Sequence, residues 1–369
     1  MAQTHHRTSI SLAESSMMQL ELSGDTQPGT TEIPFLCQTS ATDPLSDVLK
    51  VVKLTGAVFH LVEASSPWGV AVPRARDYSS IILPRAQHLI SYHIILKGSG
   101  WVEVSETAPT PFEAGDILVL SHGEPYSLLS APGQRPEYDQ EATVAFFRDW
   151  MAGKLPFVTR EGGGGPGGAE YICGFLGCDL LPFNPLLAAL PCLLRIRRSR
   201  TEKQDLLGGL IELTLSDACR PQIGSESIRL RLSELIFVEV VRLCLEALPA
   251  HETGWLSGLK DPSIGKVLTL LHGAPARPWT LKQLAREAGM SRSALAARFS
   301  HLIGQAPMQY LTLWRMQIAA RLLADNSLKV AAVGKEVGYE SEAAFSRAFK
   351  KAVGASPAKW RRKNSKVAT

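Results

Sequence analysis

The sequence predicts a multidomain chain of α and β structure, with an N-terminal antiparallel β-barrel or sandwich, a helical segment, and a C-terminal all-α domain of two helix-turn-helix units. Three observations predict this fold class. Short β-branched runs broken by Gly and Pro occupy residues 56–178. Apolar residues at helical spacing follow them, and a pattern of about 50 residues then occurs twice. A chain of 369 residues also exceeds the ~250 residues that one hydrophobic core usually supports.

The two ends of the chain are predicted to be tails. Residues 1–42 are polar and rich in Ser and Thr, which predicts a flexible tail, and residues 364–369 are a short basic tail. The N-terminus lacks the basic end and apolar block of a secretion signal, and no run reaches the ~20 apolar residues of a membrane span. We therefore expect a cytoplasmic protein without a membrane partner.

A β domain is predicted over residues 43–183, where Asp43 caps a short first helix. Its β-like runs include LISYHIILKGSGWVEV and PFEAGDILVLSHGEPYSLL, separated by turn residues. The glycine-rich run 162–168 matches G-x-G-x-x-G literally, but Pro166 interrupts it and no helical pattern follows. We interpret this run as a loop between two late strands and not as a dinucleotide site.

Helical patterns replace the β-like runs from Asn184 onward, with longer helices predicted over residues 204–215 and 227–248. In the last helix Arg231, Glu239, Arg242 and Glu246 fall on one narrow stripe and nearly every other residue is apolar, so the helix must be buried on several sides. We predict that residues 184–248 form a helical transmission and dimerisation segment, packed on the β domain and on a second copy in a homodimer. The Pro-, Gly- and polar-rich residues 249–262 are predicted to be a linker.

The formal net charge of +4 hides an uneven distribution. The chain has 39 Lys and Arg and 35 Asp and Glu, of which the residues from Ser263 onward hold 18 and 5, a net charge of +13. The preceding residues hold 21 and 30, a net charge of −9. A strongly basic domain is typical of proteins that bind a polyanion such as nucleic acid. A basic, solvated surface without such a partner is the alternative.

An internal repeat at a spacing of 49–50 residues lies within this basic region. Each copy has a helical pattern, a glycine where the first helix ends, and a serine that caps a second helix. One long helix over residues 308–324 is predicted between the copies. The matched pairs are Ala285 and Gly334, Gly289 and Gly338, Ser291 and Ser341, Leu295 and Phe345, Phe299 and Phe349, Gly304 and Gly354, Pro307 and Pro357, and Tyr310 and Trp360.

Each copy has the pattern of a helix-turn-helix unit, whose second helix enters the major groove of DNA while the first crosses the backbone. Ala285 and Gly334 are small because two helices cross there and leave no space for a larger side chain. One such unit is a common two-helix hairpin, whereas two of them in a domain of net charge +13 indicate DNA binding. One chain can then address two successive major-groove segments, ~34 Å apart.

Residues 263–363 resemble the DNA-binding domain of AraC/XylS-family transcriptional regulators. The resemblance lies in LAREAGMSRSALAARFSHLIGQAPMQYLTLWRMQIAARLLAD and VGKEVGYESEAAFSRAFKKAVGASPAKWRR. It implies that the second helix of each unit supplies side chains to base edges. The matching positions are Arg292, Ser293, Ala296 and Ala297 in the first copy and Glu342, Ala343, Ser346 and Arg347 in the second.

Base discrimination is predicted to depend on Arg347. The equivalent residue of the first copy is Ala297, which can contact a thymine methyl group but cannot pair with guanine. Arg292 or Arg298 would add to base discrimination if either side chain reaches the groove. Other basic residues are predicted to contact phosphates, with a solvated helix face or an internal ion pair as the alternative. These residues are Lys282, Arg286, Arg298, Arg315, Lys329, Lys350, Lys351, Arg361 and Arg362.

The β domain resembles the cupin-like sensor domain of one branch of these regulators, through segments such as HIILKGSGWVEV and YICGFLGCDLLPFNPLLAALP. Because many cupins bind a metal through His and Glu, His88, His93 and His122 are weak candidates for metal ligands. The chain has no His-x-His pair in this region, and a lone histidine on a strand is more often packed or at the surface. We therefore predict no metal, no other cofactor and no catalytic residue.

The six cysteines are scattered and form no CxxC pair, which favours a reducing compartment and gives a zinc site no support. Cys173 lies in the Cys-Gly-Phe segment shared with the sensor branch and is a candidate redox sensor, with Cys178 and Cys192 as possible partners. Some relatives respond to reactive chlorine or electrophiles through cysteine oxidation, and the resemblance extends that hypothesis to this chain. Burial as small apolar side chains is the alternative.

These patterns together predict a sequence-specific transcription regulator, by family habit an activator. It would bind double-stranded promoter DNA and RNA polymerase and respond to an unidentified small molecule or oxidant. One alternative is a cupin-type metal-dependent isomerase or dioxygenase with an appended nucleic-acid-binding domain, which metal analysis of the purified protein would identify. Another is architectural DNA binding without sequence preference, which a comparison of specific and random DNA would identify.

Overall fold

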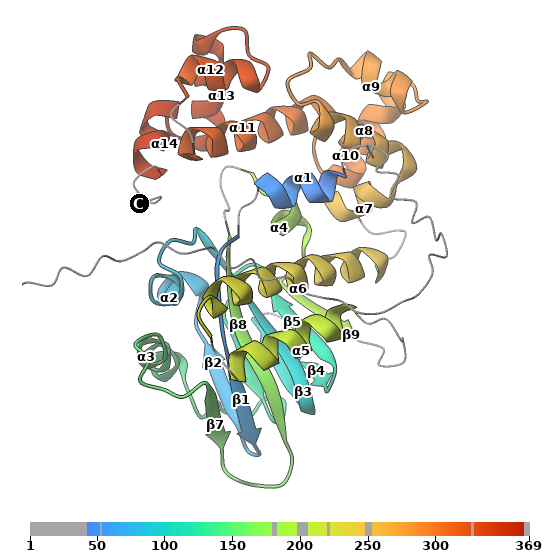
Figure 1. Ribbon diagram of the computed structural model, residues 1–369. Coiled ribbons are helices and arrows are strands. Elements are labelled where there is room, and N and C mark those ends of the chain that lie inside the picture. The colour runs from blue at the N-terminus through green and yellow to red at the C-terminus, as the bar shows by residue number, and fades with distance from the viewer. Residues whose placement is uncertain are drawn as a thin grey trace, which may run out of the picture. The chain divides into compact units, whose positions relative to one another are not determined.

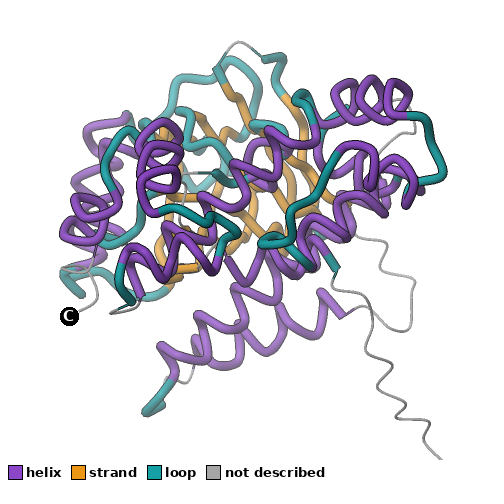
Figure 2. The backbone as a smooth tube through the Cα atoms, turned by 90° about the horizontal axis from the view of Figure 1, so that it is seen from above, coloured by secondary structure: helices purple, strands orange, loops and turns teal. Residues whose placement is uncertain are grey.

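The N-terminal half of the computed structural model is built on one sheet (Figures 1 and 2). Its order is β2-β6-β3-β8-β1-β7, with β4 and β5 paired to β3 and β9 paired to β5. Every pairing is antiparallel except that of β1 with β7. The strands are β1 (Leu54–Ser65), β2 (Gly69–Val72), β3 (His88–Val104), β4 (Thr110–Glu113), β5 (Asp116–Leu120), β6 (Tyr126–Leu129), β7 (Val158–Gly162), β8 (Gly168–Cys178) and β9 (Leu193–Arg197).

The long strand β3 bends and exchanges partners along its length. Its first part pairs with β8 and β5, and from Ser99 onward it pairs with β4 and β6. The exchange occurs beside Gly98, which has φ +74° and lies so close to the Gly168 carbonyl that a Cβ atom would not fit. The bend curves the sheet into a half-barrel, which confirms the predicted β-barrel or sandwich.

The two faces of the sheet pack into two different cores, as the side-chain alternation of a strand requires. On β8, Tyr171, Cys173 and Phe175 belong to the core inside the half-barrel, whereas Ile172 and Cys178 belong to the core on the opposite face. Cys173 and Cys178 therefore lie on opposite faces of the sheet, as their spacing of five residues predicts. This alternation decides which side chains reach the barrel interior.

Helices cover both faces of this sheet. Helices α2 and α3 pack against each other and against β3 and β2, and α3 brings Phe147 into the barrel core. Helices α5 and α6 form an antiparallel pair in which α6 packs on β1 and β9 (Figure 1). The helices of this half are α1 (Pro44–Val51), α2 (Ala75–Ile82), α3 (Gln140–Met151), α4 (Pro185–Ala189), α5 (Leu206–Cys219) and α6 (Ser225–Ala247).

The predicted segment 184–248 is not wholly helical, which corrects one expectation. Strand β9 lies within it and pairs with β5. Leu194 and Ile196 are buried while Arg197 is exposed, which is the alternation of a strand. This run of five residues is too short for its period to be separated from the helical patterns around it.

The C-terminal half is all helical, as predicted, and α11 connects its two repeated units (Figure 1). The predicted helix 308–324 is confirmed as α11. The predicted linker 249–262 is wrong in part, because α7 lies within it with Trp255 and Leu256 buried. The helices are α7 (Trp255–Lys260), α8 (Pro262–Gly273), α9 (Leu281–Glu287), α10 (Arg292–Ile303), α11 (Pro307–Asp325), α12 (Val330–Glu336), α13 (Glu342–Val353) and α14 (Pro357–Asn364).

The structure describes residues 43–51, 54–105, 107–178, 183–197, 206–219, 222–247, 253–325 and 328–364. The predicted tail 1–42 and residues 365–369 of the predicted basic tail lie outside the described residues. No helix in the described part of the chain is long and apolar enough to cross a membrane.

Candidate nucleic-acid interface and barrel pocket

The first helix-turn-helix unit consists of α9 and α10. Gly289 takes a left-handed conformation in the turn, at φ +67°, where a residue with a Cβ atom would be strained. Ser291 caps α10 by accepting a hydrogen bond from the Ala294 N–H at 3.2 Å. Ala285 of α9 and Phe299 of α10 are both buried. The turn, the cap and the small residue at the crossing are confirmed.

The second unit, α12 and α13, repeats this geometry. Gly338 has φ +82°, and Ser341 caps α13 by accepting from the Ala344 N–H at 3.4 Å. A Cβ atom built on Gly334 would lie 3.2 Å from Cβ of Phe345, closer than an ordinary van der Waals contact. The glycine at the helix crossing therefore follows from the packing of Phe345 against α12, as the sequence indicates.

The predicted base-contact residues lie at the N-terminal ends and outer faces of α10 and α13. The side chains of Arg292, Ala297 and Arg347 are exposed. Within the described residues neither arginine has a hydrogen-bond or ion-pair partner, so both guanidinium groups are available to a ligand. The remaining candidates are exposed or half-buried, namely Ser293, Ala296, Glu342, Ala343 and Ser346.

Several predicted phosphate-binding residues have partners within the protein. Arg298 donates from Nε to the Asp261 carboxylate at 2.8 Å. Arg315 donates from Nε to the Pro275 carbonyl at 2.7 Å. These two arginines thus hold the loops before α8 and α9. Because their guanidinium groups already have partners within the protein, we do not expect them to be the main phosphate contacts. Arg286 pairs with Glu287 and Arg361 bonds to the Leu328 carbonyl, whereas Lys282, Lys329, Lys350, Lys351 and Arg362 are exposed.

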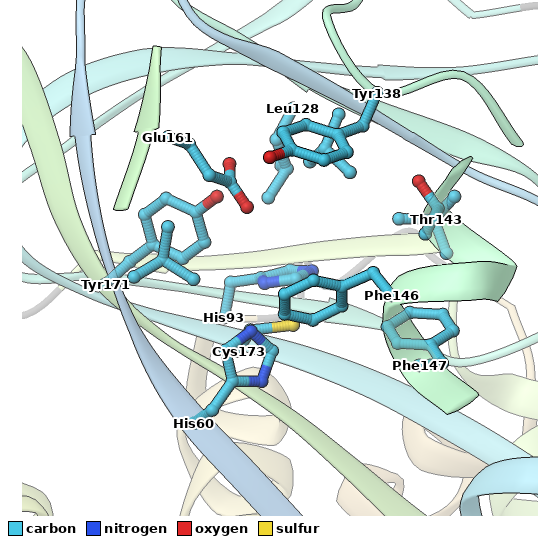
Figure 3. A pocket seen from close by; sticks show the side chains of 13 residues that line it. His60, His93, Leu128, Tyr138, Thr143, Phe146, Phe147, Glu161, Tyr171 and Cys173 are labelled. Atoms are coloured by element: carbon cyan, nitrogen blue, oxygen red, sulfur yellow. The ribbon is translucent and has the colours of Figure 1, made fainter. Parts of the chain in front are cut away.

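In the half-barrel, two histidines and one cysteine from three different strands form a row. His60 on β1, Cys173 on β8 and His93 on β3 are direct neighbours in strand register and share the inner face (Figure 3). His93 Nε2 lies 2.9 Å from the Tyr126 hydroxyl, and the His60 ring packs against Phe146 and Trp150. The sequence identified His93 and Cys173 as candidates but gave no reason to select His60.

This row forms one wall of a pocket that opens to solvent and has an enclosed volume of about 30 Å³. Its apolar wall consists of Val62, Val70, Val72, Leu128, Phe146 and Phe147. Its polar wall adds Tyr138, Thr143, Glu161 and Tyr171 to the row (Figure 3). A concave, mainly apolar cavity with a few converging polar groups is the usual form of a small-molecule site.

Burial shifts the titration of the groups around this pocket. It lowers the pKa of His60 and of His93 to about 3, so both imidazoles are neutral at physiological pH. It raises the pKa of Glu161 to about 7, with the nearby Glu137 carboxylate as a second cause. Burial likewise raises the pKa of the Cys173 thiol, which disfavours its thiolate.

The three histidines considered as metal ligands do not converge. His88 Nε2 lies 2.6 Å from the Ser121 carbonyl, and His122 Nε2 lies 3.1 Å from the Leu187 carbonyl. His93 is directed into the barrel, where Tyr126 is its partner. No group of three or more His, Cys, Asp or Glu among the described residues could hold a metal ion.

The cysteines considered as redox sensors differ in access. Cys173 and Cys178 are buried, whereas Cys192 is exposed, and none of the three is bonded in a disulfide. Cys192 Sγ lies 3.3 Å from Nδ1 of His122. Access therefore favours Cys192 over Cys173, in contrast to the order that the sequence suggested.

Comparison with known proteins identifies both halves. The family described as "Cupin" matches residues 43–246, and the family described as "Helix-turn-helix domain" matches residues 284–363. An AraC-like transcription regulator from Streptomyces lividans is 32% identical over 323 residues, which cover 87% of this chain and 98% of the relative. The HTH-type transcriptional regulator AlkR from Acinetobacter baylyi is 28% identical over 324 residues, covering 87% and 100%. Among solved structures, the DNA-binding domain of AdpA in complex with a target DNA matches 28% of this chain and 92% of that chain, with 32% identity and a TM-score of 0.27.

A cupin half-barrel joined to a double helix-turn-helix domain defines a transcription regulator that binds double-stranded DNA. The chain belongs to the AraC-like transcription regulators. The prediction of a DNA-binding regulator is thereby confirmed. The relatives of this architecture are named as transcription regulators, which gives the cupin-enzyme alternative no support.

Proposed function

We propose that this regulator binds promoter DNA sequence-specifically as a homodimer in the cytoplasm. It activates transcription through contact with RNA polymerase, in response to a small molecule held in the barrel pocket. The observation that carries the proposal is the pairing of two different surfaces in one chain. One is a set of exposed arginines on two recognition helices, and the other is a pocket that opens to solvent and has buried polar groups directed into it.

Sequence reading rests on the recognition helices α10 and α13. Arg347 is exposed and has no partner among the described residues, so its planar guanidinium can form two hydrogen bonds to a guanine edge. Ala297 at the equivalent place of α10 cannot do so. The second unit therefore supplies the stronger base contact, and Arg292 at the start of α10 supplies a second one.

The dimer rests on the outer surface of the α5–α6 pair. Among the described residues, five of the seven exposed large apolar side chains lie on these helices and the turn between them, namely Leu206, Leu213, Ile223, Ile228 and Leu235. A second copy would bring the same side chains to the same place, so a two-fold contact would bury this surface on both subunits. We expect Leu213→Glu with Leu235→Glu to give monomers in sedimentation analysis, and Met151→Glu, on α3, to leave the dimer intact.

An oxidant is the second candidate for the signal, and Cys192 beside His122 favours it. If oxidation is the signal, Cys192→Ser removes the transcriptional response to hypochlorite while Cys173→Ser keeps it. If the pocket ligand is the signal, both variants respond normally to that ligand. A response lost only in Cys173→Ser would contradict the assignment to the accessible thiol.

Arg347→Ala tests the proposed reading of DNA. The operator is first selected from a library of random duplexes, and binding of the variant is then measured on the operator and on random DNA. We expect a loss of ~1–3 kcal/mol on the operator, confined to one base pair, and little loss on random DNA. Lys351→Ala is the matched control on the same helix, because a phosphate contact weakens binding to both DNAs alike. If Arg347→Ala lost the same binding free energy on the operator and on random DNA, the result would instead indicate architectural DNA binding without sequence preference.

A further inference from the structure

The barrel pocket contains several polar atoms that the protein leaves without partners. They are Nδ1 of His60, Nδ1 of His93, Oγ1 of Thr143 and Oε2 of Glu161, all buried and without a hydrogen-bond partner within the described residues. His60, His93 and Thr143 are each at most 2% exposed. Buried polar atoms in proteins are nearly always paired, so four orphans around one cavity point to a ligand that pairs with them.

The charges around the pocket limit the class of that ligand. Glu161 is the only ionisable carboxylate that lines it, and no Lys or Arg is among its described lining residues. The two imidazoles are neutral, because burial holds the pKa of each near 3. An anion would therefore meet the Glu161 carboxylate and no compensating positive charge, which disfavours carboxylates, phosphates and sulfonates as ligands.

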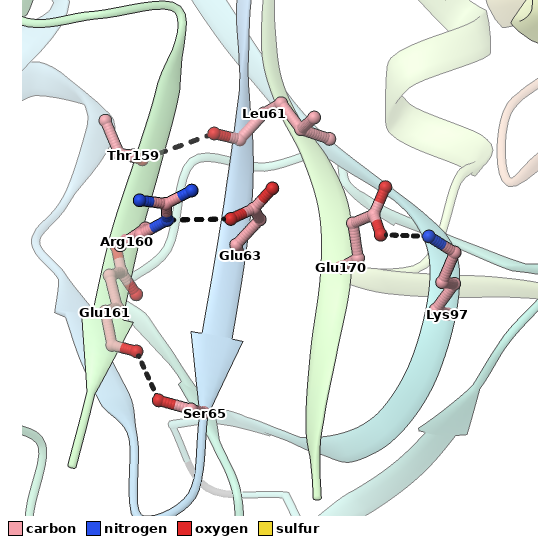
Figure 4. Close-up of polar contacts among 8 residues, drawn as sticks. All are labelled: Leu61, Glu63, Ser65, Lys97, Thr159, Arg160, Glu161 and Glu170. Carbon is pink, nitrogen blue, oxygen red and sulfur yellow. Dashed lines mark hydrogen bonds and ion pairs between the residues drawn. The ribbon is translucent and has the colours of Figure 1, made fainter. Parts of the chain in front are cut away.

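The strand pairing directs Glu161 inward. Arg160 is opposite Glu63 on the outer face, where the two side chains pair at 2.9 Å, and the next residue, Glu161, is opposite Ala64 and faces the barrel (Figure 4). The Ser65 hydroxyl donates to the Glu161 backbone carbonyl and holds this end of β7 in place (Figure 4). The Glu161 carboxylate has a hydrogen bond with Tyr171 but no ion-pair partner in the described part of the chain, because the neighbouring Arg160 pairs with Glu63 on the other face.

We propose that the pocket binds a small monocationic amine with an apolar body, with its ammonium group on Glu161 and its body against Phe146 and Phe147. The inference rests on the proposed function and names the chemical class of its signal. The Tyr171 and Tyr138 rings beside Glu161 add attraction for a cation (Figure 3). A neutral alcohol of the same shape would pair with the imidazoles but would leave the carboxylate without a counter-ion.

The titration of Glu161 gives this ligand class a pH signature. The cation binds the ionised carboxylate, and the pKa of Glu161 in the empty pocket is about 7. Affinity should therefore rise about tenfold from pH 6 to pH 8, as ionisation goes from about a tenth to about nine-tenths. Of the groups that face Glu161, burial moves the pKa of Tyr171 and Tyr138 upward and that of His60 and His93 downward. None of these four moves into that pH range, and the Glu137 carboxylate adds to the upward shift of the Glu161 pKa.

The test uses the full-length protein and three probes with one apolar body, namely 2-phenylethylamine, 2-phenylethanol and phenylacetate. Calorimetric titration should show the amine bound at least tenfold more tightly than the alcohol at pH 8, and phenylacetate most weakly. The advantage of the amine should shrink about tenfold at pH 6. Equal binding of amine and alcohol, tightest binding of phenylacetate, or no binding of the amine at millimolar concentration would each overturn the inference.

Two variants separate the carboxylate from general effects on the fold. Glu161→Gln should remove both the preference for the amine and its pH dependence, whereas binding of the alcohol persists. Glu170→Gln on β8 is the matched control, because Glu170 pairs with Lys97 on the outer face at 2.6 Å (Figure 4). Gel-shift measurements on the operator then separate the two proposals. A protein that binds the operator but shows no amine preference contradicts the ligand class alone, and one that selects no operator contradicts the proposed function.

Discussion

The two helix-turn-helix units share one plan but differ in what holds their first helices. In the first unit, Thr280 caps α9 and forms a capping box with Gln283, in which each backbone N–H pairs with the other side chain, at 3.2 and 2.9 Å. In the second unit, the equivalent cap is Lys329, whose side chain makes no cap hydrogen bond. A cation at the positive end of a helix is also electrostatically unfavourable.

The cores of the two units differ as well. Phe299 of the first unit belongs to an apolar cluster that continues through α7, α4 and α1 to one face of the sheet. Phe349 of the second unit belongs to a separate cluster confined to α11–α14, with Met316 and Trp360 among its members. The unit that lacks the cap and the extended core is the one that carries Arg347. If Arg347 reads a base as proposed, local stability and the stronger base contact belong to different copies of the same motif.

The separate cores predict different unfolding behaviour, which is the largest effect expected. Phe349→Ala removes a fully buried ring that lies 5.6 Å from Phe345 between ring centroids, at a cost of ~3–5 kcal/mol. Because its cluster is separate, we expect a new calorimetric transition at lower temperature for the second unit alone. Phe299→Ala removes an equally buried ring and should instead shift the main transition. A single common transition, shifted equally by both variants, would contradict the comparison.

A buried histidine lies beside the core of the first unit, and the second unit has no counterpart. His272 of α8 stacks on Trp314 and bonds to the Tyr310 hydroxyl at 2.7 Å, whereas no histidine follows His301 in the sequence. Burial lowers the pKa of His272 to about 3, with a smaller upward effect of Asp43. The folded protein then binds fewer protons than the unfolded chain between pH 3 and 6.5. Stability from this group is complete above pH 6.5 and falls by ~2 kcal/mol between pH 7 and 5.

Thermal unfolding at pH 7 and pH 5 measures this effect. The main transition should fall with pH, and the transition of the second unit, separated in the Phe349→Ala variant, should not move for this reason. His272→Phe keeps the ring stack but cannot be protonated, so it should reduce the pH dependence of the main transition. The part that remains includes the contributions of His60, His88 and His93 of the barrel, whose pKa values burial also lowers. An unchanged pH dependence in His272→Phe would show that this imidazole is not the group that titrates.

The DNA-binding half was predictable because its determinants are local in sequence. The Gly289 and Gly338 turns and the Ser291 and Ser341 caps act within a few residues, and the repeat makes each of them visible twice. The roles of Arg298 and Arg315 were not predictable from spacing, because their partners lie some 40 residues away in the sequence.

The barrel pocket was predictable only in outline. The alternation on β8 places Cys173 on one face, but the row with His60 and His93 depends on the register of three strands that are far apart in the chain. Glu161 had no sequence signal, because it lies in a short strand next to the glycine-rich run and pairs in parallel with β1. Tertiary pairing, and not local pattern, brings these groups together.

The difference in helix caps gives a matched pair of substitutions with a smaller effect. Thr280→Ala removes the capping box and should destabilise the first unit by ~1 kcal/mol. Lys329→Ser should stabilise the second unit by ~0.5–1 kcal/mol, because serine can accept the hydrogen bond that lysine does not and the unfavourable charge is removed. Denaturant unfolding of the two variants measures both changes. A loss of stability in Lys329→Ser would mean that the lysine contributes to the fold by another contact.

A residue that is unfavourable for its own helix requires a compensating role, and a DNA phosphate is the partner that its exposed ammonium group fits. If Lys329 neutralises one phosphate, Lys329→Ser should reduce the slope of log affinity against log salt by about one, while the more stable unit binds DNA more weakly at low salt. Thr280→Ala should leave this slope unchanged, since it removes a cap and no charge. If the salt slope were the same in Lys329→Ser and in the unmodified protein, Lys329 would not be part of the DNA interface. The substitution would then stabilise the second unit without weakening DNA binding.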